Sequence, residues 1–218
     1  MLKTLRKFII YLVDYVAPQR IDSLIVSNLD KDDILKFPKG SLVESYDWIH
    51  PLFQYRDNRV RALIWELKYR ENANYLPFIG EMLYEEILSL VSDIILFDSD
   101  AHFILIPIPI STERRIKRGF NQSEYIAKSI LPYDLEHILL YAPQWFQKTK
   151  DTKIQSKSAS KKERMENLVG CFSADSRVDG SYIILIDDVV TTGSTLSEAR
   201  KTLLKAGAKD VFAFTLAH

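Results

Sequence analysis

Two acidic residues and a group of hydroxyl-bearing residues follow one another between an apolar stretch and an expected helix. The apolar stretch Ile183–Ile186 ends in Asp187 and Asp188. The loop that follows consists of Val189, Val190, Thr191, Thr192, Gly193, Ser194 and Thr195. Ligands of open α/β sheets bind beyond the carboxyl ends of the strands, and a helix N-terminus offers unpaired N–H groups to an anion. We therefore expect this segment to hold an anionic ligand.

The residue types in this segment indicate a phosphate group next to a sugar. Gly193 lets the backbone approach a ligand closely, and the four Ser and Thr hydroxyls add donors that suit a dianionic phosphate monoester. Asp187 and Asp188 would repel a phosphate, but they can accept hydrogen bonds from neighbouring sugar hydroxyls. The segment therefore predicts a ribose 5-phosphate site, with the two acids as candidate catalytic residues.

Three other interpretations use the same residues. An apolar strand that ends in two Asp residues also resembles the metal-binding strand of P-loop ATPases, but the chain has no Gly-x-x-x-x-Gly-Lys-Ser/Thr motif. A dinucleotide-binding fold needs Gly-x-Gly-x-x-Gly after a strand, which is also missing. An ordinary helix cap explains one hydroxyl, because Ser and Thr favour caps, but it does not explain four beside two acids.

Apolar runs and helical patterns alternate along most of the chain. Phe103–Ile108 and Tyr182–Ile186 are short, almost continuous apolar runs, which is typical of strands buried on both faces. Further strands are expected at Ile138–Tyr141 and Val211–Thr215, and helices at Val60–Leu67, Pro77–Val91, Asn121–Leu131 and Leu196–Leu204. This alternation predicts an α/β fold with a central, mostly parallel sheet flanked by helices.

The first part of the chain has a different pattern. Residues 1–58 are expected to form a small helical and β-rich appendage, and residues 59–218 the main domain. Residues 1–17 have the apolar spacing of an amphipathic helix that ends at Pro18. Short strand-like pieces follow at Leu24–Val26, Ser41–Glu44 and Trp48–Phe53. No stretch is long and apolar enough to span a bilayer, so a cytoplasmic protein is expected.

Composition excludes several classes of protein. Lys plus Arg and Asp plus Glu both number 29, so the net charge of zero gives no overall attraction to DNA or to anionic membranes. The single cysteine, Cys171, rules out a disulfide framework and a cysteine-rich zinc site, and its apolar neighbours indicate a buried residue. The four histidines have no ligand spacing, so no metal held by protein side chains alone is expected.

Two basic segments contrast with this neutral composition. The first follows the expected strand Phe103–Ile108 and contains Arg114, Arg115, Lys117 and Arg118. Guanidinium groups match phosphate oxygens, and Arg118 is the preferred candidate because Gly119 and a helix start follow it. The second, residues 148–164, is rich in Lys and poor in apolar residues, which fits a mobile lid over a polyphosphate. It also fits contact with single-stranded DNA, although aromatic residues are missing after Phe146.

Asp187–Thr195 resembles the PRPP-binding motif of type I phosphoribosyltransferases. Further segments resemble the ComF/GntX family, the competence-protein relatives of these transferases. They are Pro107-Ile108-Pro109 with Arg114 and Arg118–Gln122, Thr152-x-x-Gln155, Arg164-x-x-Asn167-x-x-Gly170-x-Phe172, and Val60–Tyr69. The resemblance covers roughly residues 48–218. Within the last block, the position of Lys68 fits the C-terminal dipole of its own helix, and a role at the ligand site is the alternative, which the spacing does not support.

The resemblance implies a ligand, a metal and a set of site residues. The acids would hold the ribose hydroxyls, Val190–Thr195 the 5-phosphate, and magnesium would arrive with PRPP, with Asp187 and Asp188 as its only candidate protein ligands. Pro109, Ile110, Arg114 and Arg118 would form the pyrophosphate loop, with Arg118 also a candidate catalytic residue, and Gln155, Arg164 and Asn167 would lie in the hood loop. A homodimer is implied as well. Many members begin with a four-cysteine zinc ribbon, for which this chain lacks the cysteines.

Two kinds of function are consistent with these patterns. An enzyme would transfer phosphoribose from Mg-PRPP to a nitrogen acceptor and release pyrophosphate, as in nucleotide metabolism. A non-catalytic protein would bind PRPP or a nucleotide, or would serve as an accessory to DNA uptake, as the competence relatives imply. The second hypothesis is supported by the lack of an evident acceptor pocket and general base in the sequence.

Overall fold

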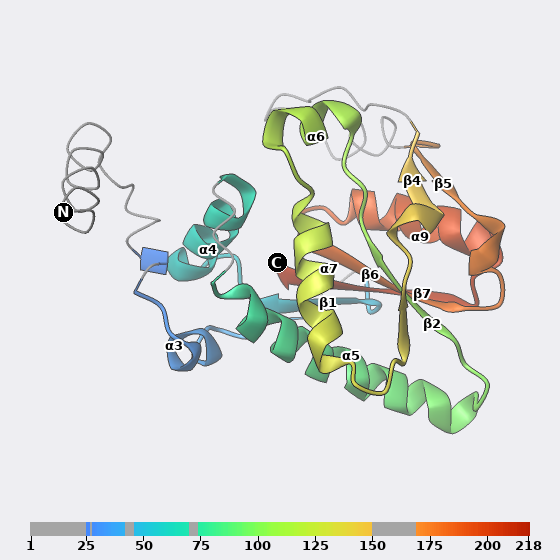
Figure 1. The fold of residues 1–218 in the computed structure, drawn as a ribbon, viewed down its shortest axis with the longest axis horizontal. Helices are drawn as coiled ribbons and strands as arrows, with labels where there is room; N and C mark the ends of the chain where they lie inside the picture. Colours follow the sequence, from blue (N-terminus) through green and yellow to red (C-terminus); the bar gives the residue numbers. More distant parts are fainter. Residues whose placement is uncertain (1–24, 27, 42–45, 70–73, 150–168) are drawn as a thin grey trace, which may run out of the picture.

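A computed structural model of the 218-residue chain describes residues 25–26, 28–41, 46–69, 74–149 and 169–218 (Figure 1). The expected helix at residues 1–17 and most of the Lys-rich segment lie outside these ranges, as do the side chains of Lys117 and Arg118. In the part of the chain that is described, no helix is long and apolar enough to cross a membrane.

A five-stranded parallel sheet forms the centre of the molecule, with strand order β1-β7-β6-β2-β3. Its strands are β1 (Ile49–Phe53), β2 (Phe103–Pro107), β3 (Leu139–Tyr141), β6 (Tyr182–Val189) and β7 (Asp210–Ala217). Every neighbouring pair runs parallel, so all carboxyl ends meet at one edge of the sheet. All five residues of β2 are buried, as its continuous apolar sequence predicts. The predicted α/β fold with a parallel sheet is thus confirmed.

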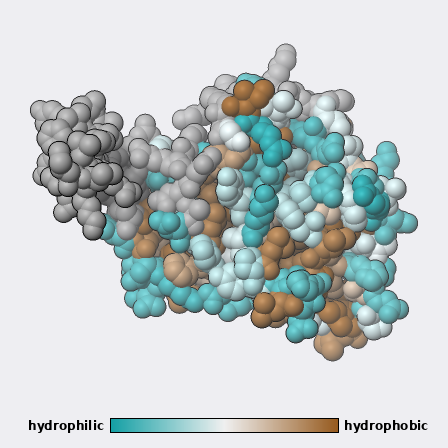
Figure 2. Space-filling view, in the orientation of Figure 1, coloured by the Kyte–Doolittle hydropathy of each residue, from teal (hydrophilic) through white to brown (hydrophobic). Residues whose placement is uncertain are grey.

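Helices cover both faces of the sheet (Figure 1). Helices α4 (Asn58–Tyr69), α5 (Leu76–Phe97) and α7 (Gln122–Ile130) pack on one face, and α9 (Ser194–Lys205) packs on the other. Alternate residues of β6 separate the two cores: Ile184 and Ile186 point to the α5 side, and Ile183 and Leu185 to the α9 side. Leu96 and Phe97, at the end of α5, are exposed, and Figure 2 shows hydrophobic residues along the lower edge of this face of the molecule.

The shorter elements lie around the sheet. Helix α3 (Lys31–Leu35) begins at a capping box formed by Asp30 and Asp33. Helix α6 (Thr112–Arg118) follows β2, and the 3-10 turns are η1 (Leu131–Tyr133), η2 (Pro143–Trp145) and η3 (Ser176–Val178). Strands β4 (Phe146–Lys148) and β5 (Phe172–Ala174) pair antiparallel as a separate two-stranded sheet.

The structure corrects two expectations about the N-terminal region. The strand-like piece Trp48–Phe53 was expected in an appendage, but β1 lies in the central sheet and pairs with β7. Leu24–Val26 was expected as a strand, but Ile25 and Val26 are helical. The apolar run alone could not show that β7 has a free edge with which β1 can pair. The division of the chain at residue 58 stays a prediction.

Helices α5 and α7 approach each other closely at Gly80. A Cβ atom at this position would lie 2.1 Å from the carbonyl oxygen of Ser129 in α7. Since the obstacle is backbone, side-chain rotation cannot relieve the overlap. The absent side chain of Gly80 therefore sets the spacing of the two helices.

We expect Gly80→Ala to destabilise the fold by about 1–3 kcal/mol, the usual cost of overpacking a core. In a helix without a close neighbour, Gly→Ala would stabilise the protein by up to about 1 kcal/mol. A net loss of stability here would therefore show that the added methyl group clashes with α7. Urea unfolding measures the difference, with Ser89→Ala at an exposed position of α5 as the control. A Gly80→Ala protein as stable as the control would show that the helices separate without cost.

Candidate functional site

The loop between β6 and α9 forms a small hollow at the carboxyl edge of the sheet. Asp187 and residues 189–196 line it, and its volume is about 40 Å³. Helix α9 begins at Ser194, and its first helical hydrogen bond runs from Ser197 N–H to the Gly193 carbonyl at 2.8 Å. The N–H groups of the first turn therefore have no partner within the helix and are available to an anion.

Gly193 holds the loop in a shape that other residues rarely adopt. Its φ angle is 72°, in the left-handed region that favours glycine. A Cβ atom here would also lie 2.6 Å from the ring of Tyr46. Tyr46 precedes β1 and packs edge-on against Trp48, with ring centroids 5.8 Å apart. Tyr46 thus packs against the loop, a contact that no local sequence pattern indicates.

The hydroxyl groups of the loop interact with one another. The Thr192 and Ser194 hydroxyl oxygens are 2.9 Å apart, and Ser194 N–H donates weakly to the Thr192 hydroxyl at 3.5 Å. Thr191 is exposed, whereas Thr192 and Thr195 are half-buried. The structure therefore brings the predicted hydroxyl-bearing residues together around the start of α9, as the phosphate interpretation requires.

Asp187 and Asp188 lie in the last three residues of β6 rather than in the loop, because the strand continues to Val189. Asp187 Oδ1 accepts a hydrogen bond from the Ser123 hydroxyl at 3.1 Å and another from the Asp188 N–H at 2.9 Å. Asp188 Oδ2 forms an ion pair with Lys68 Nζ at 3.0 Å. Neither acid lies in a dry core, since both keep part of their surface exposed.

The environment of Asp187 favours its protonated form. Burial raises the pKa of Asp187 to about 7, and repulsion from Asp188 adds to the effect. The hydrogen bonds from Asp188 N–H and Ser123, and the charge of Lys68, act in the opposite direction. A carboxyl group whose pKa is raised in this way is common at functional sites.

Ser123 is positioned by Asn121, the N-cap of α7. The Asn121 side-chain oxygen accepts from Ser123 N–H at 3.2 Å, and its amide donates to the Ile108 carbonyl at 3.0 Å. Asn121 and Ser123 are 2% and 3% exposed, so water cannot replace these bonds. Asn121 therefore fastens the start of α7 to the residues that follow β2, and places Ser123 next to Asp187.

The predicted pyrophosphate loop is partly helical. Pro109 and Ile110 are half-buried at the end of β2, and Ser111 caps α6 by accepting from Arg114 N–H at 3.3 Å. The Arg114 side chain is exposed. Arg115, in contrast, donates from its Nη2 atom to both carboxylate oxygens of Glu124, each at 3.0 Å. Arg118 lies at the end of α6, and its side chain is outside the described residues.

The predicted hood residues Gln155, Arg164 and Asn167 also lie outside the described part of the chain. Strands β4 and β5 flank this segment on either side. Two larger hollows include predicted site residues in their lining, the first at the loop between β6 and α9 and the second at Pro109 and Ile110. One, of about 440 Å³, shares residues 189–191 with the loop and is also lined by Arg56 and His218. The other, of about 450 Å³, runs from Pro109 and Ile110 to β4.

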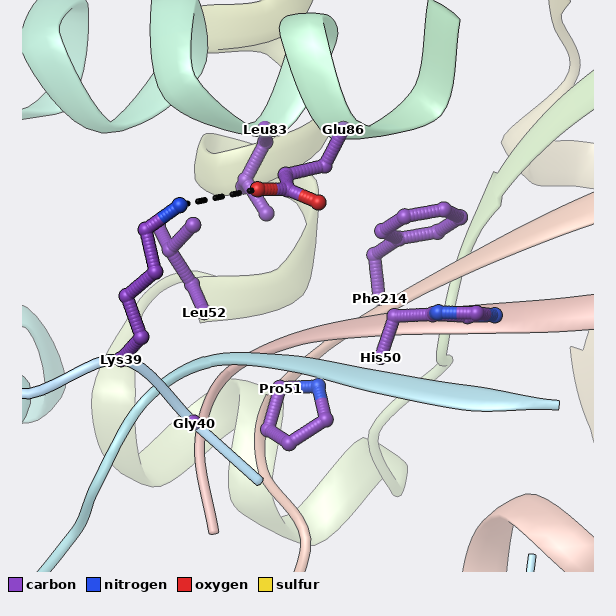
Figure 3. Close-up of a pocket in the computed structure, with 8 residues that line it drawn as sticks. All are labelled: Lys39, Gly40, His50, Pro51, Leu52, Leu83, Glu86 and Phe214. Carbon is purple, nitrogen blue, oxygen red and sulfur yellow. Dashed lines mark ion pairs between the residues drawn. The ribbon is translucent and has the colours of Figure 1, made fainter. Parts of the chain in front are cut away.

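A further pocket, of about 250 Å³, lies between β1 and α5 (Figure 3). Lys39 and Glu86 form a 3.8 Å ion pair across it, and the His50 ring stacks on Phe214 with centroids 4.9 Å apart. None of residues 187–195 lines this pocket. It is therefore separate from the candidate site.

A parallel sheet with an acid pair at the end of one strand and a hydroxyl-rich loop at a helix start defines a type I phosphoribosyltransferase domain. Residues 144–218 match the family model of the phosphoribosyl transferase domain. Among curated proteins, the chain is 30% identical over 179 residues to the DNA utilization protein YhgH of Escherichia coli, covering 80% of this chain and 70% of that protein. The chain therefore belongs to the ComF family of phosphoribosyltransferase-like proteins.

Other relatives match a smaller share of their own length. The competence protein ComFC of Bacillus subtilis is 38% identical over 121 residues, which cover 54% of this chain and 45% of that protein. A solved structure, the glutamine PRPP amidotransferase of B. subtilis, aligns with 16% identity and a TM-score of 0.42, over 70% of this chain and 30% of the other. The fold assignment rests on the strand order and the family match rather than on this alignment.

We expect Asp187→Asn to stabilise the folded protein near pH 8 by on the order of 2 kcal/mol, since one pKa unit corresponds to about 1.4 kcal/mol and Asp187 keeps some solvent contact. The folded state favours the protonated acid, so wild-type stability falls relative to the variant as pH rises from about 4, the unfolded-state pKa, through about 7. Urea unfolding across this pH range measures the difference in unfolding free energy between the variant and the wild type, with Asp93→Asn on the surface of α5 as the control. A stability difference that is constant with pH, or that grows as pH falls, would contradict the raised pKa of Asp187.

Proposed function

We propose that this domain binds PRPP, with the ribose 5-phosphate group in the segment Asp187–Thr195. The observation that carries the proposal is the joint placement of two opposite kinds of group. N–H groups without a partner inside the helix and a group of hydroxyls surround a hollow at the start of α9, and β6 places Asp187 in its lining with Asp188 next in the chain. The first set suits a phosphate and the second suits the ribose hydroxyls.

Magnesium would arrive with PRPP. Among the described residues, no group of three or more His, Cys, Asp and Glu side chains could hold a metal ion. Asp187 and Asp188 supply carboxylate oxygens, which magnesium prefers, and magnesium commonly combines one or two protein carboxylates with substrate phosphates. The acid pair therefore fits an ion that is shared with the ligand.

The reaction we propose transfers phosphoribose to a nitrogen acceptor. The bond between the anomeric carbon and the pyrophosphate oxygen breaks, and pyrophosphate leaves with the bonding electrons. The acceptor nitrogen forms the new bond to the anomeric carbon and releases its N–H proton to solvent. Catalysis would consist mainly of positioning and charge stabilisation. Arg114 and Arg118, beside Pro109 and Ile110, would neutralise the pyrophosphate, and a hood carrying Gln155, Arg164 and Asn167 would exclude water. We further propose a cytoplasmic homodimer.

Calorimetric titration with Mg-PRPP should show saturable binding to the wild-type protein. Asp188→Asn should weaken this binding by about tenfold or more, because hydrogen bonds to a charged group contribute about 1.5–3 kcal/mol. Asp93→Asn, on the surface of α5, should bind like the wild type. Absence of heat and of saturation at millimolar Mg-PRPP would defeat the proposal.

A second candidate function is an accessory role in DNA uptake, which is favoured by the names of two relatives, a competence protein and a DNA utilization protein. If the protein binds PRPP but releases no pyrophosphate with any nucleobase or amine, the non-catalytic hypothesis holds. Gel-shift assays with single-stranded DNA at several salt concentrations test DNA contact. An affinity that falls steeply with salt supports it, and a slope near zero removes it.

A further inference from the structure

Lys68 reaches the acid pair from a distant part of the chain. It lies in the last turn of α4, and its ammonium group is 3.0 Å from Asp188 Oδ2. Side-chain exposure is 24% for Lys68 and 15% for Asp188, so the pair is largely shielded from water. Val60, Leu63 and Leu67 of α4 are buried in the core, which fixes the position from which Lys68 extends.

The location of this ion pair distinguishes it from a surface salt bridge. The sequence left two roles open for Lys68, at the dipole of its own helix or at the ligand site, and the ammonium group meets a carboxylate at the end of β6. The neighbouring Asp187 already accepts two hydrogen bonds, from Ser123 and from Asp188 N–H. Lys68 is thus the positive charge that offsets two adjacent carboxylates in the free protein.

A lysine in this position competes with the ligand that the proposed function requires. A magnesium ion shared between PRPP and Asp188 would need the carboxylate oxygen that the ammonium group contacts. Two cations a few ångströms apart repel strongly in a shielded site. The lysine side chain is flexible and can turn away, whereas the strand that carries Asp188 cannot.

We propose that Lys68 is a built-in counter-ion of the ribose site, which occupies Asp188 in the free protein and is displaced by the divalent cation that accompanies the ligand. The inference rests on the proposed function and adds to it a competition between Lys68 and metal. It makes Lys68 a positioning residue rather than a catalytic one. It also couples the end of α4 to the occupancy of the site.

Titration with Mg²⁺ alone tests the competition. Lys68→Met should bind the ion about tenfold or more tightly than the wild type, because a neighbouring positive charge has been removed. Lys68→Arg keeps the charge and should resemble the wild type, and Lys201→Met, at an exposed position of α9, controls for the loss of a lysine. A folded Lys68→Met protein with unchanged or weaker Mg²⁺ affinity would overturn the proposal, since a merely structural ion pair predicts lost stability without any gain in metal binding.

A second measurement uses the wild-type protein and does not depend on a variant that folds. Acylation of lysines, read by mass spectrometry of peptides, should label Lys68 faster once Mg-PRPP saturates the site, relative to Lys201. Unchanged or slower labelling of Lys68 under proven saturation would contradict displacement. If the wild type fails to bind Mg-PRPP, the proposed function fails, whereas the Mg²⁺ titration of Lys68→Met still decides whether Lys68 competes with metal.

Discussion

The carboxylates of two consecutive residues, Asp187 and Asp188, repel each other, and the surrounding contacts of the site offset this repulsion. Alternate residues of a strand point to opposite faces, which separates Asp187 and Asp188 in direction but leaves them close. The protein compensates with a different partner for each acid. Asp187 receives hydrogen bonds, and Asp188 receives a cation. The pKa of Asp187 is nevertheless raised, first by burial and then by repulsion from Asp188, so a further positive charge or hydrogen-bond donor would favour its ionised form.

A bound ligand can supply the donors and the positive charge that the two acids lack. Sugar hydroxyls donate hydrogen bonds, and a divalent cation carries charge, so either would relieve the strained acid pair. The adjacent loop has the opposite character, because the dipole of α9 and its free N–H groups favour an anion. A ligand with a phosphate at one end and a diol beside it relieves both. Pre-existing electrostatic strain of this kind is a common feature of binding sites, where stability is lost in favour of function.

Segments far apart in the sequence build this site together. The acids come from β6, Ser123 from α7 and Lys68 from α4, while Tyr46, just before β1, packs against Gly193. Asn121 in turn links α7 to the residues after β2. The family match begins at residue 144, yet several of these contacts come from residues before it. The first half of the described chain therefore shapes the site as well as covering the sheet.

The sequence by itself determined the strands of the central sheet, the acid pair and the hydroxyl-rich loop. These features are local: an apolar run, two acids, and hydroxyls before a helix can be recognised from neighbouring residues alone. It could not show that Lys68 and Ser123 contact the acids, that Tyr46 packs on the loop, or that β1 joins the sheet. Those contacts join residues up to 164 positions apart, between Ile49 of β1 and Ala213 of β7, and no local pattern encodes them. Only the tertiary structure decided them, because strand order and helix packing determine which distant side chains meet at the carboxyl edge.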